Sequence, residues 1–294
     1  MRLVLLLLCT LAISGCVRHL GAPEGEPPAL PDYDVAVIED RVYTPDDWPQ
    51  ALHADIYRPE PPGRYPTVLM VHGGGWERRS PEDTAGLARQ LAEQGFVVVN
   101  IEYRFAPEYT FPAQLHDLQM AMRWLHVHAD DYGIDRSRVG AWGYSSGAHL
   151  VTLLATVAAD TDSPLNEPYG GPVTRPRAVV AGGTPTDLRK FEGGTLVPQF
   201  LGGPQESNAA IYAAASPVTH VGADTPPHLL YHGTLDSVVP VDHAEDYRTA
   251  LNANGVDNEL LLLRGKGHVA AFLFGGAAED AGAAFLARTL TPAH

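Results

Sequence analysis

Residues 138–150 read RVGAWGYSSGAHL and join a short apolar run to a segment with helical spacing. Glycines stand two residues before and two residues after Ser145, so the pattern G-x-S-x-G is centred on Ser145 and not on Ser146. A serine on a sharp strand-to-helix turn needs small residues at those two places, because the chain there passes too close to itself for side chains. The stretch therefore predicts a nucleophile turn at the end of a buried strand.

The same alternation of apolar runs and helical segments continues along the chain. Nearly continuous apolar or β-branched residues predict buried strands in PTVLMVHGGG, GFVVVNIEYR, RVGAWGYS, RAVVAGG, HLLYHG and ELLLLRG. Helical spacing predicts helices over residues 82–94, 112–130, 146–159, 241–254 and 277–289. This order predicts an α/β fold with a mostly parallel central sheet and helices on both faces.

Two further features complete the predicted fold. The runs DVAVIEDRVYT and ALHADIYRP, before the first parallel strand, predict a short antiparallel edge. The stretches TDSPLNEPYGGPVTR and KFEGGTLVPQFLGGP predict loops of modest length, so no large lid is expected.

The N-terminus has the layout of an export signal. Residues 1–15 hold one arginine, an apolar run and small residues, which is typical of a secretory signal peptide; a membrane span would need about 20 apolar residues. The end of the run resembles a bacterial lipobox, which implies cleavage before Cys16 and lipidation of Cys16. Cys9 fits worse, because the bulky Leu8 precedes it, and a plain signal peptide cut nearby is the alternative. The expectation is an exported bacterial lipoprotein anchored to a membrane.

The rest of the chain is predicted to form one domain behind a spacer. Residues 16–33 are rich in proline and glycine and predict a spacer that begins at the lipidated cysteine, and residues 34–294 predict a single α/β domain. The chain has two cysteines, Cys9 and Cys16, so no disulfide is expected in that domain. A formal net charge of −15 argues against a nucleic-acid partner, which needs clustered positive charge.

A serine nucleophile needs a base and an acid that orients the base. A serine hydroxyl is a poor nucleophile unless a base takes its proton and a third group fixes that base. Asp236 follows the strand in YHGTLDSVVP, and His268 follows the next strand in LLLLRGKGHVAAF. The chain order Ser145, Asp236, His268 is the order expected in this architecture. These three residues are therefore the predicted catalytic set.

Rivals exist for two members of the set. Asp187 follows the preceding strand and is the alternative acid, although a helix cap or a loop support is the simpler role. Among the 13 histidines, His232 and His243 are nearest to His268 in sequence, but His232 lies inside a strand exit and His243 opens a helix.

The run VHGGGW, residues 71–76, predicts an oxyanion hole where a central strand ends. Backbone N–H groups aimed at the developing negative charge lower the barrier of acyl transfer, and consecutive glycines let the backbone approach that charge. No phosphate-binding glycine motif is present in this run. The predicted donors are the N–H groups of Gly74, Gly75 and Ser146. Loop support and pocket lining are assigned to His72, Trp76 and Tyr144. No metal site is predicted, since His126 and His128 have no apparent third ligand.

These residues together resemble the α/β-hydrolase superfamily. The likeness runs from about residue 34 to the C-terminus and is strongest to HGGG-containing esterases and lipases, in the branch with bacterial carbohydrate-ester and feruloyl-type esterases. It implies hydrolysis of carboxylic esters through an acyl-enzyme, without a cofactor. Tyr144 before the nucleophile and the acid motif HGTLDSVVP depart from the hormone-sensitive-lipase branch.

The expected substrates are small esters with short acyl chains, with acetyl esters of carbohydrates as one candidate class. An amidase, arylformamidase or peptidase-like hydrolase of the same fold is the alternative, because one site geometry serves esters and some amides. A hydrolase-fold scaffold that only binds is a third reading. The sequence does not determine the oligomeric state.

Overall fold

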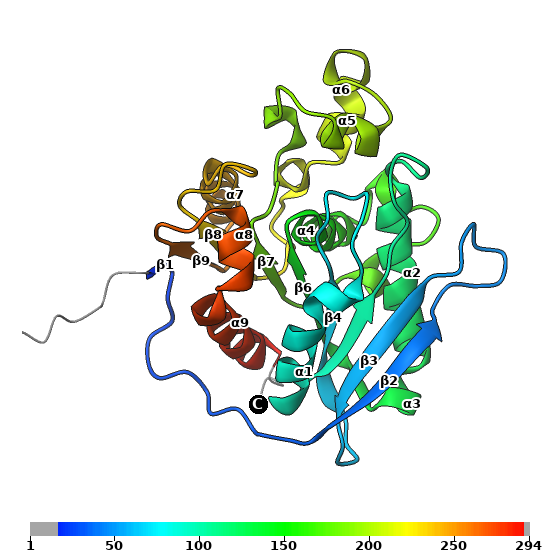
Figure 1. Ribbon diagram of the computed structural model, residues 1–294, viewed down its shortest axis with the longest axis vertical. Coiled ribbons are helices and arrows are strands. Elements are labelled where there is room, and N and C mark those ends of the chain that lie inside the picture. Colours follow the sequence, from blue (N-terminus) through cyan, green and yellow to red (C-terminus); the bar gives the residue numbers. More distant parts are fainter. Residues whose placement is uncertain (1–16, 291–294) are drawn as a thin grey trace, which may run out of the picture.

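The computed structural model describes residues 17–290, so the predicted signal peptide, Cys9 and Cys16 lie outside the described residues. One sheet runs through this part of the chain in the order β1-β9-β8-β7-β6-β4-β5-β3-β2 (Figure 1). Its strands are β1 (Val17–Leu20), β2 (Val35–Val42), β3 (His53–Pro59), β4 (Tyr65–Val71), β5 (Val97–Ile101), β6 (Ile134–Tyr144), β7 (Val179–Gly182), β8 (His228–Gly233) and β9 (Asn258–Leu263).

The six central strands are parallel, and their register aligns the loops that carry the predicted site. β4 pairs with β6 so that Val71 lies opposite Gly143, and β6 pairs with β7 so that Tyr144 lies opposite Gly182. β8 and β9 continue the parallel sheet and end together at Gly233 and Leu263. The segments that follow β4, β6, β8 and β9 therefore all leave the sheet at the carboxyl ends of its parallel strands, where ligands of such folds bind.

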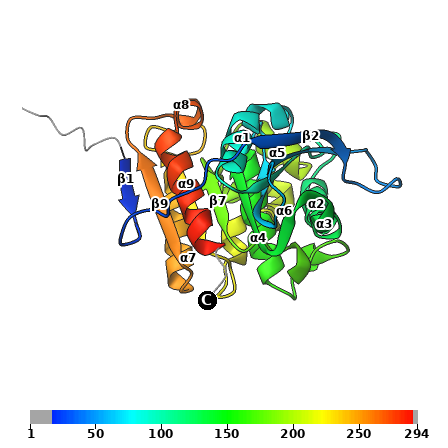
Figure 2. The same cartoon turned by 90° about the horizontal axis from the view of Figure 1, so that it is seen from below.

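Two layers of helices cover the sheet (Figure 2). Alternate residues of β4 show the two faces: Leu69 and Val71 belong to the core under one layer, and Val68 and Met70 to the core under the other. The first layer holds α2 (Ala113–Val127), α4 (Ser146–Ala159) and α7 (Asp242–Ala253), and the second holds α1 (Ala85–Glu93) and α9 (Gly276–Thr289). The predicted α/β fold is confirmed, including the antiparallel β2–β3 edge.

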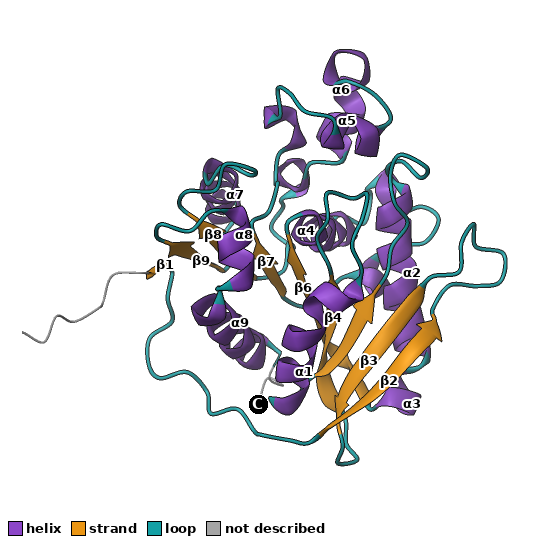
Figure 3. Cartoon of the chain, in the orientation of Figure 1, coloured by secondary structure: helices purple, strands orange, loops and turns teal. Residues whose placement is uncertain are grey.

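Short helices appear where the sequence predicted loops or gave no helical pattern (Figure 3). The expected loop KFEGGTLVPQFLGGP contains α5 (Leu196–Leu201), and α6 (Gln205–Ala214) follows it. Both lie beyond the carboxyl ends of the parallel strands (Figure 1). The others are α3 (Ala129–Tyr132) and α8 (His268–Leu273). Helices of four to six residues have too few turns to show a periodic apolar face, so tertiary contacts decide them.

The spacer predicted from residue 16 to residue 33 differs from the structure at its beginning. Residues 17–20 form β1, which pairs antiparallel with β9 from Val17 opposite Leu263 to Leu20 opposite Leu260. His19 Nε2 also lies 2.8 Å from Glu259 Oε2. An edge strand of this kind is held by backbone hydrogen bonds, which leave no apolar pattern in four residues.

The remaining part of this segment passes α9 and α1 at the end of the sheet away from the predicted site, and then reaches β2 (Figure 1). Leu30 packs against the core beneath α1 and α9, and the Tyr33 N–H donates to the Glu93 carbonyl at 2.8 Å. Among the helices of residues 17–290, none combines the length and apolar character that crossing a membrane requires.

Candidate active site

The nucleophile turn is built by close approach of two backbones. Ser145 lies between β6 and α4 with φ 55° and ψ −122°. A residue other than glycine adopts this backbone conformation only under strain. A Cβ atom added at Gly143 would lie 2.4 Å from the Gly147 carbonyl carbon, and one added at Gly147 would lie 2.2 Å from the Val71 carbonyl oxygen. Both glycines are therefore required for the turn, as the spacing around Ser145 predicted.

Three loops bring the predicted catalytic side chains together. His268 Nε2 lies 2.8 Å from Ser145 Oγ, and His268 Nδ1 lies 2.6 Å from Asp236 Oδ2. Because the carboxylate only accepts hydrogen bonds, Nδ1 carries the proton of the neutral ring and Nε2 is free to accept from the serine hydroxyl. This tautomer makes His268 a base directed at Ser145.

Asp236 is buried and receives hydrogen bonds on both oxygens. Oδ1 accepts from the backbone N–H groups of Val238 and Val239, each at 2.9 Å. Burial by itself raises the pKa of Asp236, but the hydrogen bonds from His232, His268 and the Val239 N–H outweigh it and lower the pKa below its usual value. The carboxylate therefore stays ionised and available to His268.

His232 has a supporting position that the sequence did not predict. Its Nε2 lies 2.8 Å from the Val239 carbonyl and 3.3 Å from Asp236 Oδ2. A carbonyl only accepts, so Nε2 carries a proton, and it faces the same carboxylate oxygen as His268 Nδ1. The four-residue spacing from Asp236, across the turn that ends β8, is the sequence signal that could have indicated this contact.

The rival residues lie in other contacts. The Asp187 carboxylate accepts from the Arg189 N–H at 3.1 Å and from Arg189 Nε at 2.7 Å, which is the capping role considered for it. The Asp187 N–H points to His243 Nδ1 at 3.4 Å, so the alternative acid and one alternative base lie against each other. The structure brings neither to Ser145.

The glycine loop after β4 lies against the nucleophile turn. A Cβ atom at Gly73 would be 3.0 Å from the Tyr144 carbonyl oxygen and 3.4 Å from Ser145 Cβ. Gly74 and Gly75 have φ values of 124° and 65°, which glycine adopts without strain. Ser146 opens α4, so its N–H lacks an acceptor within the helix. The loop thus meets the nucleophile turn at Gly73, directly before the predicted donors Gly74 and Gly75, and the third predicted donor, Ser146, directly follows Ser145.

Trp76 and His149 fix the end of this loop. Trp76 Nε1 donates to His149 Nδ1 at 3.2 Å, and His149 Nε2 donates to the Ala215 carbonyl at 2.7 Å. Burial lowers the pKa of His149 to about 4, so the ring is neutral near pH 7. The Trp76 ring stacks on Phe200 of α5 with centroids 4.6 Å apart. These contacts join the oxyanion loop to α4 and to the α5–α6 segment.

His72, predicted to support the loop, is fully buried at its start. Its Nδ1 donates to the Gly73 carbonyl at 2.7 Å, and its ring stacks on Tyr103 with centroids 4.6 Å apart. Burial lowers the pKa of His72, which keeps the imidazole neutral. A neutral, stacked ring adds no charge to the site and holds the glycines in place.

The loop after β5 braces the other side of Trp76. The Ala106 N–H donates to the Trp76 carbonyl at 2.9 Å. Arg104 forms a buried ion pair with Asp117 of α2, with Nε 2.8 Å from Oδ1, and its guanidinium lies over the Trp48 ring. A buried ion pair with several hydrogen bonds fixes its loop in one arrangement, because separating it would leave buried charge unpaired.

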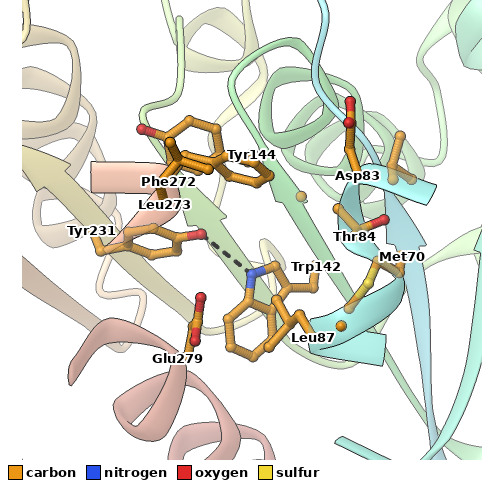
Figure 4. Close-up of a pocket in the computed structure, with 13 residues that line it drawn as sticks. Met70, Asp83, Thr84, Leu87, Trp142, Tyr144, Tyr231, Phe272, Leu273 and Glu279 are labelled. Atoms are coloured by element: carbon orange, nitrogen blue, oxygen red, sulfur yellow. Dashed lines mark hydrogen bonds between the residues drawn. The ribbon is translucent and has the colours of Figure 1, made fainter. Parts of the chain in front are cut away.

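Tyr144 supports the histidine loop from behind the nucleophile. Its hydroxyl donates to the His268 backbone carbonyl at 2.6 Å, and its ring lies 5.2 Å from the His268 ring. Burial raises the pKa of the Tyr144 phenol, so it remains a donor. Figure 4 shows Tyr144 beside Phe272 and above Tyr231, whose hydroxyl accepts from Trp142 Nε1 at 3.5 Å.

These aromatic rings line a cavity of about 170 Å³ on the α1 and α9 face of the sheet. Leu87 closes it from α1 and Glu279 from α9 (Figure 4). Burial raises the pKa of Glu279. Its lining includes Tyr144, the residue before Ser145, but neither Ser145 nor His268.

Residues 17–290 contain no group of three His, Cys, Asp or Glu side chains that could hold a metal ion. The two histidines singled out in the sequence lie at the exposed end of α2. His128 pairs with Asp131 at 2.9 Å, and the His126 carbonyl accepts from Arg136.

A family model described as BD-FAE matches residues 54–251. The match covers more than half of the chain, so this chain belongs to that family, which is of the α/β-hydrolase type.

Similar sequences and structures include three named proteins. Probable carboxylic ester hydrolase LipM of Mycobacterium tuberculosis is 32% identical over 213 residues, which are 68% of this chain and 49% of LipM. Esterase LipC of the same organism is 30% identical over 248 residues, 79% of this chain and 60% of LipC. A solved truncated form of a carbohydrate esterase from gut microbiota has a TM-score of 0.77 at 22% identity, covering 91% of this chain and 100% of that chain. The chain thus spans about half to three-fifths of the two curated relatives, and the structural likeness concerns the fold.

Replacing Gly147 with alanine tests the close approach that shapes the turn. The added methyl would meet the Val71 carbonyl, so we expect Gly147→Ala to lower the free energy of unfolding by about 1–3 kcal/mol, as overpacking does. Urea denaturation measures this loss. The matched control is Gly86→Ala in α1, where an added Cβ meets nothing within 4 Å and stability should stay equal or rise slightly. Equal stability of the two variants would contradict the constraint.

Proposed function

We propose that this chain is a serine hydrolase of carboxylic esters that works through an acyl-enzyme. The observation that carries the proposal is the continuous contact from Ser145 Oγ through the His268 ring to Asp236 Oδ2, at 2.8 and 2.6 Å. The names of the relatives, a carboxylic ester hydrolase and an esterase, support it.

In the proposed reaction, Ser145 Oγ attacks the ester carbonyl carbon while His268 Nε2 takes the hydroxyl proton. Asp236 stabilises the imidazolium that forms. The carbonyl oxygen becomes an oxyanion, which the N–H groups of Gly74, Gly75 and Ser146 receive.

The imidazolium then gives its proton to the departing alkoxide, the C–O bond breaks, and an acyl-serine remains. Water, deprotonated by His268, attacks the acyl carbon in the same way, and the acid leaves as Ser145 regains its proton. The scheme requires no cofactor.

We infer that the substrates have short acyl chains, with acetyl esters of carbohydrates as the leading class. Leu196 at the start of α5 lies over the oxyanion loop, since its side chain would be 3.1 Å from a Cβ added at Gly75. A side chain at that distance limits the space beside the oxyanion. The α5–α6 segment is also too small to form an enclosed tunnel for a long chain.

The two adjacent serines give a direct test of the mechanism. We expect Ser145→Ala to lose about 10⁶ in kcat on p-nitrophenyl acetate and to lose labelling by a fluorophosphonate probe. The control Ser146→Ala keeps the backbone N–H, so it should keep labelling and lose less than about tenfold in kcat/KM. An unlabelled wild type would instead support a scaffold that only binds.

A substrate panel separates the ester reading from the amide reading. We expect p-nitrophenyl acetate and butyrate, together with acetylated sugars, to be hydrolysed faster than long-chain esters or aminoacyl p-nitroanilides, because Leu196 limits the space for an acyl chain and the relatives are named as ester hydrolases. The measurement is kcat/KM for each substrate. Faster cleavage of an arylformamide or an anilide would favour the amidase alternative, and a preference for long-chain triglycerides would contradict the short-acyl inference.

We also propose that the protein is exported and anchored through a lipid on Cys16. The support is the arrangement of residues 1–16, which lie outside the described part of the chain. In cells, the wild type should fractionate with membranes and incorporate labelled fatty acid, whereas Cys16→Ala should lose the label. Incorporation that survives Cys16→Ala, or none in the wild type, would refute the anchor.

A further inference from the structure

We propose that the edge of the sheet that carries the active site docks on a membrane surface through an exposed apolar cluster beside His268. The cluster consists of Val17 at the start of β1, Leu235 in the segment after β8, and Val269, Leu273 and Phe274 on and just after α8. Their exposed fractions are large for such residues: Val17 38%, Leu235 67%, Val269 64%, Leu273 60% and Phe274 69%. Scattered exposed hydrophobics are ordinary, but a contiguous group marks an interaction site.

Hydrogen bonds hold these segments side by side. The Leu235 N–H donates to the Lys266 carbonyl at 2.9 Å, and the Gly265 N–H donates to Thr234 Oγ1 at 3.0 Å. Val269 and Leu273 lie one turn apart on α8, and Lys266 Nζ bonds the Phe274 carbonyl at the end of that helix. The segments that carry these residues therefore lie side by side, with α8 next to β8 (Figure 1).

The register of β1 brings the N-terminal flank of the chain to the end of β9. Because β1 is antiparallel to β9, Val17 lies opposite Leu263, the last residue of β9. Residues 264–267, which follow β9, lead directly to His268. Val17 is also the described residue next in the chain to Cys16, the predicted lipidation site.

The occupant that fits both observations is a phospholipid surface. The predicted lipid on Cys16 would enter a bilayer next to the apolar cluster, and the apolar side chains would meet the interface at the same time. Arg264 and Lys266 lie in the loop between β9 and α8 and suit anionic headgroups. The net charge of −15 opposes a purely electrostatic attachment, so the apolar side chains must carry the contact.

The direction of docking rests on the proposed anchor, but the surface itself is testable without it. The chain from residue 17 onward keeps every described strand and helix, has no lipid and contains no cysteine. We expect it to bind vesicles of phosphatidylcholine and phosphatidylglycerol weakly in a sedimentation assay. Leu273→Ser with Phe274→Ser should lower the partition coefficient at least about tenfold, because two large apolar side chains are lost from the contact.

The matched control is Val127→Ser at the end of α2, another exposed hydrophobic, 73% exposed, that lies outside the cluster. It should leave vesicle binding unchanged. A single cysteine labelled with an environment-sensitive dye reports the contact directly. Emission should shift to the blue on vesicle addition for Phe274→Cys and not for Val127→Cys.

Three results would overturn the proposal: no vesicle binding by the wild-type chain, equal binding by the double serine variant, or equal dye shifts at the two positions. Dimerisation that is lost in the double variant, without vesicle binding, would assign the cluster to a second copy of the chain instead. The vesicle assay involves neither Ser145 nor Cys16. Failure of esterase activity or of lipidation would thus be recognised separately, by fluorophosphonate labelling and by fatty-acid incorporation.

Discussion

The structure depends on the contact between the turn at Ser145 and the end of β4. Gly147 passes so close to the carbonyls of Val71 and His72 that a single Cβ atom would not fit. This approach fixes the serine in its positive-φ conformation and sets the glycine loop beside it. The strain at Ser145 is maintained by the parallel pairing of β4, β6 and β7, which gives the turn no freedom to relax.

A second layer of contacts holds the surroundings of that turn in place. The Trp76 ring is fixed by His149 on one edge and by Phe200 on its face. Because His149 also holds the Ala215 carbonyl, the small helical segment above the site and the oxyanion loop form one packed unit. A change in α5 would therefore be transmitted to the glycines through Trp76. Neutral imidazoles serve this purpose well, since they join two polar partners without bringing charge into the core.

The sequence was sufficient for the parallel sheet and for the serine, because both leave strong local signals. Continuous apolar runs predict buried strands, and the glycines around Ser145 predict the nucleophile turn because they lie between a predicted strand and a predicted helix. Asp236 and His268 followed from chain order, since each comes shortly after a predicted strand. His232 was considered only as an alternative base, because its contact with Asp236 depends on how the chain turns after β8. The helix α5 and the strand β1 were missed because tertiary packing and backbone pairing, which have no side-chain pattern, determine them.

The pairing of β1 with β9 also bears on which esters the proposed active site could reach. A free proline- and glycine-rich tether from residue 16 to residue 33 would let the domain wander through a layer roughly 20–25 Å deep. With residues 17–20 fixed in the sheet, a domain anchored at Cys16 as proposed would not have that freedom, and Ser145 would stay at a nearly constant height above the anchor. Distance from the anchor would then contribute to substrate selection. Immobile esters close to the attachment point would be within reach, whereas identical esters in the bulk solution would have to diffuse to the site.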